Sequence, residues 1–267
     1  MNKKIFIRNS LTPSKGFTLV EMALVIIVIG IIISSVQSYY ANGIKAVNQT
    51  KIKSIIASIS ESVVSFAILN HRLPCADINA NGYEGGMSRT CGIGTLNTTG
   101  SVPYKTLKMN FIANSQNQRV KKNIVYGVYR HAKVLANNDA DLAINKERTG
   151  NEASSQSYKN NFDFIKALAN AQNSATNSQY IYTTGVVANE KCGNVIDANY
   201  AFIIASAGVE DADNDNNVFD GVNKNLSLSG TGTHCFSSPF KRQSSQYDDL
   251  VITMDFSTLI GRLNANN

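Results

Sequence analysis

The 267-residue sequence lacks the short motifs that mark common catalytic sites. Its three histidines, His71, His131 and His234, are scattered and do not form the His-Glu-x-x-His pattern of zinc enzymes. It contains neither the Gly-x-Ser-x-Gly turn of serine hydrolases nor a phosphate-binding glycine loop followed by lysine. These absences exclude the enzyme classes that such motifs define, and we expect a protein without enzymatic activity.

Proline is scarce as well, and none occurs between Pro13 and Pro74. Proline interrupts a helix because it lacks a backbone N–H group, so its absence leaves this part of the chain open to one long helix. Apolar residues recur there at spacings of three and four, the period of an amphipathic helix. We predict one helix from about Phe17 to Leu69 that ends before Pro74.

Acidic residues are absent from residues 1–16, which are basic. The basic side chains there are Lys3, Lys4, Arg8 and Lys15, so much of the formal net charge of +6 belongs to this short segment. The overall positive charge is therefore weak evidence for nucleic-acid binding.

The apolar segment at residues 17–36 has the length of a bilayer-spanning helix and carries a single charge, Glu21. No small-x-small cleavage signal follows it, so a secretory signal peptide is poorly supported. A carboxylate inside hydrocarbon is costly, and such residues are usually paired and functional. Cleavage between Gly16 and Phe17 would create an amino group near Glu21, and the amine of a neighbouring copy could then neutralise the carboxylate.

Residues 15–32, KGFTLVEMALVIIVIGII, resemble the signal of type IV pilin-like proteins. The family pattern is a basic leader, then Gly, Phe, Thr, Leu, a fourth residue and Glu, followed by an unbroken apolar helix. The resemblance implies that prepilin peptidase removes residues 1–16 by cutting between Gly16 and Phe17 and then methylates Phe17. It also implies that Glu21 pairs with the amine of a neighbouring subunit during assembly. The alternative is an ordinary signal anchor.

The resemblance further implies a single-pass protein of the inner membrane. Residues 17–70 would form the long helix, with the transmembrane and assembly part at about 17–38, and residues 71–267 would form a periplasmic domain. The partners implied are other pilin or pseudopilin subunits, prepilin peptidase and the inner-membrane assembly platform. The subunit would later enter a periplasmic or cell-surface filament, and we do not expect nucleic acid as a partner.

The sequence after residue 70 predicts an α+β domain, with an antiparallel sheet packed on the second half of the long helix. The pilin-like resemblance implies the same layout. A short helix is expected at residues 157–172, and a strand followed by a helix at residues 249–263. Further strands are expected at residues 123–130, 179–187 and 199–208.

Four cysteines are present, and none forms a Cys-x-x-Cys pair, so a zinc ribbon is not indicated. Two disulfides are the natural interpretation for an exported chain, although four free thiols are an alternative. Of the three pairings that four cysteines allow, we favour the sequence-local one, Cys75–Cys91 with Cys192–Cys235.

An aspartate-rich run in the second half of the chain suggests a calcium loop, because alternate side chains can turn toward one ion. The candidate ligands are Asp211, Asp213, Asp215, Asn217 and Asp220. Asn216 and Val222 replace the Gly and Glu that an EF-hand requires, so the choice lies between another kind of calcium loop and a solvated acidic turn. Asp248 and Asp249 are further candidate ligands, and Asp248 could instead cap the next strand. Some pseudopilins, which residues 201–256 resemble, hold calcium in a loop of this half.

We therefore expect a non-enzymatic filament subunit, a minor pilin or a pseudopilin of a type II secretion or type IV pilus machine. Residues 72–82 resemble the segment after the long helix in some minor pilin-like proteins, and the helix lacks the proline that many major pilins have near Ser38. One alternative is a DNA-binding or adhesive minor pilin. Its basic residues would be Arg119, Lys121, Lys122, Lys241 and Arg242. A membrane-anchored periplasmic enzyme is a weaker alternative, since no catalytic constellation supports it.

Overall fold

A computed structural model describes the protein at residues 16, 18–85, 89, 91–92, 98–109, 123–131, 139–146, 148, 160–186, 191–193, 196–228 and 233–265. The leader before Gly16 and the residue Phe17 lie outside the described residues. The chain divides into two compact units, Met1–Val47 and Asn48–Asn267.

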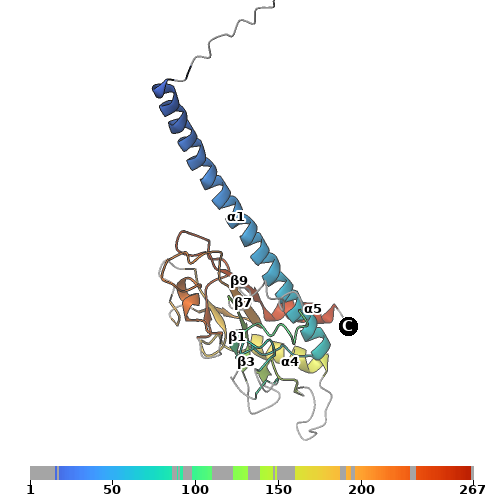
Figure 1. Ribbon diagram of the computed structural model, residues 1–267. Coiled ribbons are helices and arrows are strands. Elements are labelled where there is room, and N and C mark those ends of the chain that lie inside the picture. The colour runs from blue at the N-terminus through green and yellow to red at the C-terminus, as the bar shows by residue number, and fades with distance from the viewer. Residues whose placement is uncertain are drawn as a thin grey trace, which may run out of the picture. The chain divides into compact units, whose positions relative to one another are not determined.

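The longest element is the helix α1, Leu19–Asn70, which confirms the long helix predicted from the sequence (Figure 1). The hydroxyl groups of Ser34 and Ser35 donate to carbonyl oxygens one turn earlier, at 2.9 and 3.0 Å, so these bonds pair two polar groups inside the helix itself. The helix ends before His71, whose φ of 52° is the left-handed conformation common after a helix C-terminus.

Two stretches of α1 are apolar enough to be compared as membrane segments. Among the described side chains, Gly43–Asn70 is long and apolar enough to cross a membrane, whereas Leu19–Ser35 is a shorter apolar stretch. However, Gly43–Asn70 buries Ile56 and Ile59 in the core of the second unit. Because that apolar face is already covered by protein, we assign the membrane-spanning part to the stretch that begins at Leu19.

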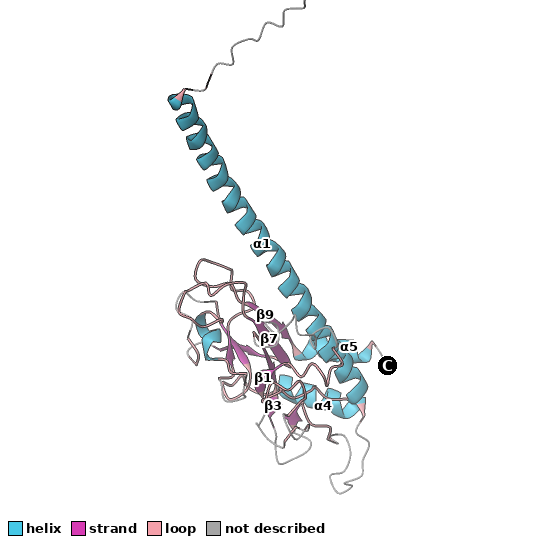
Figure 2. Ribbon diagram, in the orientation of Figure 1, coloured by secondary structure: helices cyan, strands magenta, loops and turns pink. Residues whose placement is uncertain are grey.

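The second unit contains a four-stranded antiparallel sheet in the order β1-β2-β7-β9 (Figure 2). Its strands are β1 Thr99–Ser101, β2 Ile124–Val128, β7 Phe202–Ser206 and β9 Leu250–Met254. Every residue of β2 and β7 is buried, as expected for apolar strands that are covered on both faces. The second half of α1 contributes Ile56, Ile59 and Val63 to the same hydrophobic core, so the α+β layout is confirmed.

The remaining elements are β3 Arg130–His131, β4 Ala140–Asp141, α4 Asn161–Gln172, β5 Tyr182–Thr184, β6 Ile196–Asn199, the 3-10 helix η4 Gly221–Asn225, β8 Cys235–Phe236 and α5 Phe256–Asn264. Strand β3 pairs with β4, and β6-β5-β8 form a small sheet in which β5 and β8 are parallel. This parallel pair was not expected from the sequence. The small sheet meets β2 at Gly127, where a Cβ atom would lie 2.9 Å from the ring of Phe236.

Local sequence signals determine where two helices begin. The side chain of Asn160 accepts a hydrogen bond from the backbone N of Asp163 at 3.2 Å, and the Asp163 carboxylate accepts one from Asn160, which makes a capping box for α4. Asp255 accepts from the backbone N of Thr258 at 2.7 Å and starts α5 directly after β9. The strand and helix predicted at residues 249–263 are therefore confirmed.

The four cysteines form two disulfides, Cys75–Cys91 and Cys192–Cys235, and none is free. These are the sequence-local pairings. The first fixes the loop that follows α1, and the second joins the residues before β6 to strand β8. Both close loops in the second unit, where they restrict the unfolded chain and thereby stabilise the domain.

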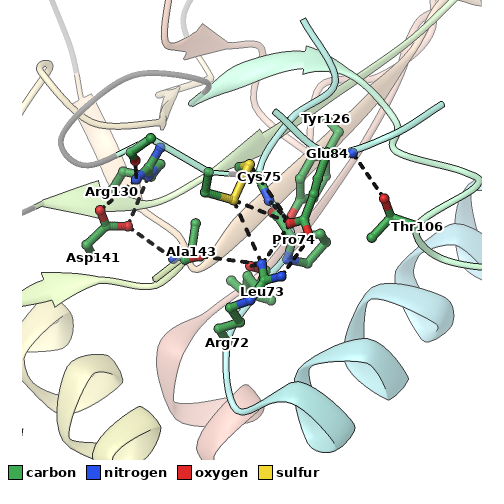
Figure 3. Close-up of a disulfide and its surroundings, with 12 residues drawn as sticks. Arg72, Leu73, Pro74, Cys75, Glu84, Thr106, Tyr126, Arg130, Asp141 and Ala143 are labelled. Atoms are coloured by element: carbon green, nitrogen blue, oxygen red, sulfur yellow. Dashed lines mark hydrogen bonds and ion pairs between the residues drawn. A yellow bond between two sulfur atoms is a disulfide. The ribbon is translucent and has the colours of Figure 1, made fainter. Parts of the chain in front are cut away.

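Ion pairs that are wholly or largely buried lie next to the first disulfide (Figure 3). The guanidinium of Arg72 donates to both carboxylate oxygens of Glu84, at 2.7 and 2.6 Å, and Glu84 also accepts from the backbone N of Cys75. Arg130, which is fully buried, donates to both oxygens of Asp141 at 3.0 and 2.8 Å. Removing one partner of such a pair leaves a buried charge uncompensated, at a cost of about 3–5 kcal/mol. The first pair lies within the loop after α1 and the second joins β3 to β4, while Arg130 also donates to the carbonyl oxygen of Gly92 in that loop at 2.5 Å.

Candidate functional site

The first described residue is Gly16, which is exposed. A Cβ atom added to it would have no other atom within 4 Å. Thr18 precedes the first residue of α1, and Glu21 lies in the first turn. Phe17 lies outside the described residues, so the position of the amine that cleavage would create is not part of this geometry. The structure thus places the predicted assembly glutamate one helical turn from the predicted cleavage site.

Thr18 and Glu21 form a capping box at the start of α1. One carboxylate oxygen of Glu21, Oε2, accepts hydrogen bonds from the backbone N of Thr18 at 2.9 Å and from its hydroxyl at 3.1 Å. The Thr18 hydroxyl in turn accepts from the backbone N of Glu21 at 3.3 Å. This is the Thr-x-x-Glu pattern in which two side chains satisfy the backbone N–H groups at a helix N-terminus.

The capping box gives Glu21 a role within its own chain that the sequence analysis did not name. It holds the carboxylate at the helix N-terminus, directed back toward residue 18. Thr18 is the residue that was missed, and its signal in the sequence was the three-residue spacing to Glu21.

The aspartate-rich loop connects β7 to η4, and backbone N–H groups of the loop donate to the carboxylate of Asp211. Asp211 accepts hydrogen bonds from the backbone N of Asp215 at 3.2 Å and from that of Asn216 at 2.8 Å. Asn214 and Asn216 have φ values of 55° and 70°, the left-handed conformation that asparagine tolerates better than most residues. Asn217 Oδ1, a further candidate ligand atom, accepts from the backbone N of residue 219 at 3.1 Å.

A lysine from η4 meets the same loop. The ammonium group of Lys224 forms ion pairs with Asp213 and with Asp215, the latter at 2.6 Å. The hydrogen bonds to these carboxylates raise the pKa of Lys224, and the lysine lowers the pKa of Asp215. The loop therefore already contains a cation that belongs to the chain. Lys224 was not among the residues named from the sequence.

A second carboxylate group adjoins the loop. Asp220 accepts from the backbone N of Asp248 at 2.7 Å, and Asp249 accepts from that of Asp220 at 3.0 Å. Asp248 accepts from the backbone N of Val209 and Glu210, at 2.8 and 3.1 Å. Burial raises the pKa of Asp249 to about 7 and also raises that of Asp220. Asp248 thus anchors residues 209 and 210, in addition to preceding β9 as expected.

The carboxylates of the loop have a spacing that suits a calcium ion, but several of them already have other partners. Oxygens of Asp211, Asp213 and Asp220 lie within 4.8 Å of one another, close enough for one ion to reach all three. However, Asp211 and Asp220 already accept backbone N–H groups, and Asp213 carries the ammonium of Lys224. The five predicted ligands do not fit a calcium ion as the loop stands, because a positive charge already lies on two of them.

The basic residues of the nucleic-acid alternative are only partly described. The ammonium of Lys241 lies 4.0 Å from the ring centroid of Tyr247, and Arg242 is exposed. Arg119, Lys121 and Lys122 lie outside the described residues. The structure therefore does not bring these five residues together as one described surface.

Comparison with known families identifies the N-terminal segment. Residues 12–36 match the prokaryotic N-terminal methylation motif, which is the type IV prepilin signal. Neither the curated proteins nor the solved structures contain a match to the chain. A prepilin signal followed directly by an apolar helix is the arrangement of a type IV pilin-like protein.

The motif carries consequences for processing and location. It implies cleavage by prepilin peptidase, assembly with other pilins in the membrane, and a single membrane-spanning helix. It points to a structural filament subunit. The match includes Gly16, Phe17 and Glu21, and it ends within α1, at residue 36.

Proposed function

We propose that the protein is a minor pilin or pseudopilin of a type II secretion or type IV pilus machine. The observation that carries the proposal is the prepilin signal at residues 12–36 together with the uninterrupted helix α1. One feature of the helix favours a minor subunit over a major pilin: α1 contains no proline. Both disulfides suit the periplasm, which is where we place residues 71–267.

The mechanism is non-covalent assembly through the first half of α1. Prepilin peptidase exposes the amine of Phe17, and the apolar side chains from Leu19 onward leave the bilayer to pack against the same segment of other subunits. During this transfer the carboxylate of Glu21 exchanges its hydrogen bonds with Thr18 for the amine of a neighbouring Phe17. A buried carboxylate requires such a partner, since an unpaired charge in an apolar filament core would be strongly unfavourable.

The test is the incorporation of a Glu21→Ala variant into filaments in cells that express the whole machine. The membrane and sheared-filament fractions are compared by quantitative immunoblot. We expect normal membrane levels and a drop in the filament fraction of roughly tenfold or more, because removing one partner of a buried ion pair costs about 3–5 kcal/mol. Glu61→Ala is the matched control, since Glu61 lies on the same helix, is exposed and pairs with Arg262. Wild-type incorporation of Glu21→Ala would refute the pairing role.

A further inference from the structure

The aspartate-rich loop concentrates negative charge in a short segment of the domain. Asp211, Asp213, Asp215 and Asp220 fall within ten residues, from 211 to 220, directly after Glu210. The carboxylates of such a loop repel one another unless a cation offsets their negative charge. Two sources of positive charge are available in principle, a bound metal ion or a basic side chain.

Lys224 supplies that charge from a fixed position. It lies near the end of η4, and its ammonium contacts Asp213 and Asp215 while its backbone oxygen accepts a hydrogen bond from the side chain of Asn217 at 3.2 Å. Both ends of the residue are therefore tied to the loop. The helix η4 is also fixed by a second contact, because the side chain of Asn223 donates to the carboxylate of Asp249 at 2.9 Å.

The ammonium and a calcium ion would compete for the carboxylate of Asp213. Calcium binds six to eight oxygens at about 2.3–2.6 Å, so two ligands of one ion lie at most about 5 Å apart. Asp211, Asp213 and Asp220 satisfy that limit, with oxygens within 4.8 Å of one another. In the described part of the chain, Oδ1 of Asp213 is buried and accepts no hydrogen bond. These three carboxylates thus have the spacing for an ion, and the ammonium of Lys224 already pairs with one of them, Asp213.

We propose that Lys224 takes the place of a calcium ion in this loop, so that the protein closes the loop without metal and gains a calcium site only when the ammonium is removed. The inference does not depend on filament assembly. It predicts a domain whose stability is insensitive to calcium, in spite of a sequence typical of calcium loops. It also predicts that one substitution reverses this property.

The experiment uses the full-length protein in detergent and the variant Lys224→Met, which keeps the length of the side chain and removes its charge. Thermal unfolding is measured in EDTA and in excess calcium chloride, and calcium affinity is measured by titration calorimetry. We expect no shift for the wild-type protein. For Lys224→Met we expect a lower Tm in EDTA, recovery in calcium as linkage requires, and calcium affinity roughly tenfold or more above that of the wild type.

Three further variants make the outcome decisive. Lys166→Met removes an exposed lysine from α4 and should behave as the wild type. The double variant Lys224→Met with Asp213→Asn should lose the acquired calcium affinity. Lys224→Arg keeps the positive charge and should remain insensitive to calcium, which provides a test even where Lys224→Met does not fold.

Several results would overturn the proposal. Calcium stabilisation of the wild-type protein equal to that of Lys224→Met would place the ion elsewhere, for example at Asp220, Asp248 and Asp249. A folded Lys224→Met variant without calcium affinity would show that the loop is only a solvated acidic turn. Calcium-dependent folding of Lys224→Arg would show that the charge at this position does not exclude the ion.

Discussion

The two halves of α1 share one backbone but lie in different surroundings. In the first half, Leu19–Val47, large apolar side chains such as Leu24, Ile27 and Ile31 are 62–63% exposed. In the second half, Asn48–Asn70, Ile59 and Val63 are fully buried in the core of the domain. The stretch Leu19–Ser35 of the first half carries a single charged residue, Glu21, whereas the second half places its polar residues on the side away from the core.

This difference shows what each half requires for stability. Helices in water gain most of their stability from packing of an apolar face, and the second half has that packing within its own chain. A contiguous apolar surface as large as that of the first half is a site of association with lipid or protein. The prepilin signal at its N-terminus implies both kinds of association, with the membrane and with other pilins.

Replacing a large side chain in each half should give the largest contrast. Ile59→Ala should lower the free energy of unfolding of the domain by about 2–5 kcal/mol, because it removes fully buried methyl groups and leaves a cavity. Ile27→Ala should leave that free energy unchanged. Guanidinium unfolding of the detergent-solubilised protein, followed by tyrosine fluorescence since the chain has no tryptophan, measures both. Equal destabilisation by the two variants would contradict the division of α1.

Glycine positions allow a smaller test of the same division. Gly43 in α1 and Gly261 in α5 are both helical, and neither has an atom within 4 Å of the place of a Cβ. Gly→Ala in a helix stabilises it by about 1 kcal/mol. Gly43→Ala should therefore slow amide exchange only around residue 43, by roughly fivefold. Gly261→Ala should instead raise the global stability of the domain, and the reverse pattern would argue against two separate units.

The smallest effect is expected from the ion pair between Arg262 on α5 and Glu61 on the second half of α1. Their atoms are 2.7 Å apart, but the side chains are 39% and 64% exposed. Exposed pairs contribute about 0–1 kcal/mol, so Arg262→Ala should change the free energy of unfolding by no more than this. A loss of several kcal/mol, in the same guanidinium experiment, would mean that α5 is fastened to α1 by this pair rather than by its buried leucines.

Much of this architecture was predictable from the sequence. The apolar period and the lack of proline predicted the long helix, and residues 249–263 were predicted as a strand followed by a helix. The strand predicted at residues 199–208 is confirmed as β7, Phe202–Ser206, but its first residue, Asn199, ends a separate strand, β6, and the chain breaks between the two. The break depends on which strands pair with each segment, and that information is not local.

Charged residues were the least predictable. Arg130 ends an apolar strand segment, and nothing in its neighbourhood reveals that it is fully buried against Asp141, eleven residues later. Lys224 likewise follows an acidic loop without any motif, and only the fold brings its ammonium to Asp213. Glu21 differs because its role is encoded by a short pattern, Thr-x-x-Glu after a glycine, that requires no tertiary structure to be read.

The measurement that tests the central claim most directly is N-terminal and intact-mass analysis of the mature protein isolated from its native membrane. The account predicts a chain that starts at Phe17 with a methylated amine and retains the apolar half of α1. A chain that starts at Met1 would contradict it, because Glu21 would then have no processed amine to pair with. A chain that starts after Val36 would remove the assembly helix and with it the filament subunit.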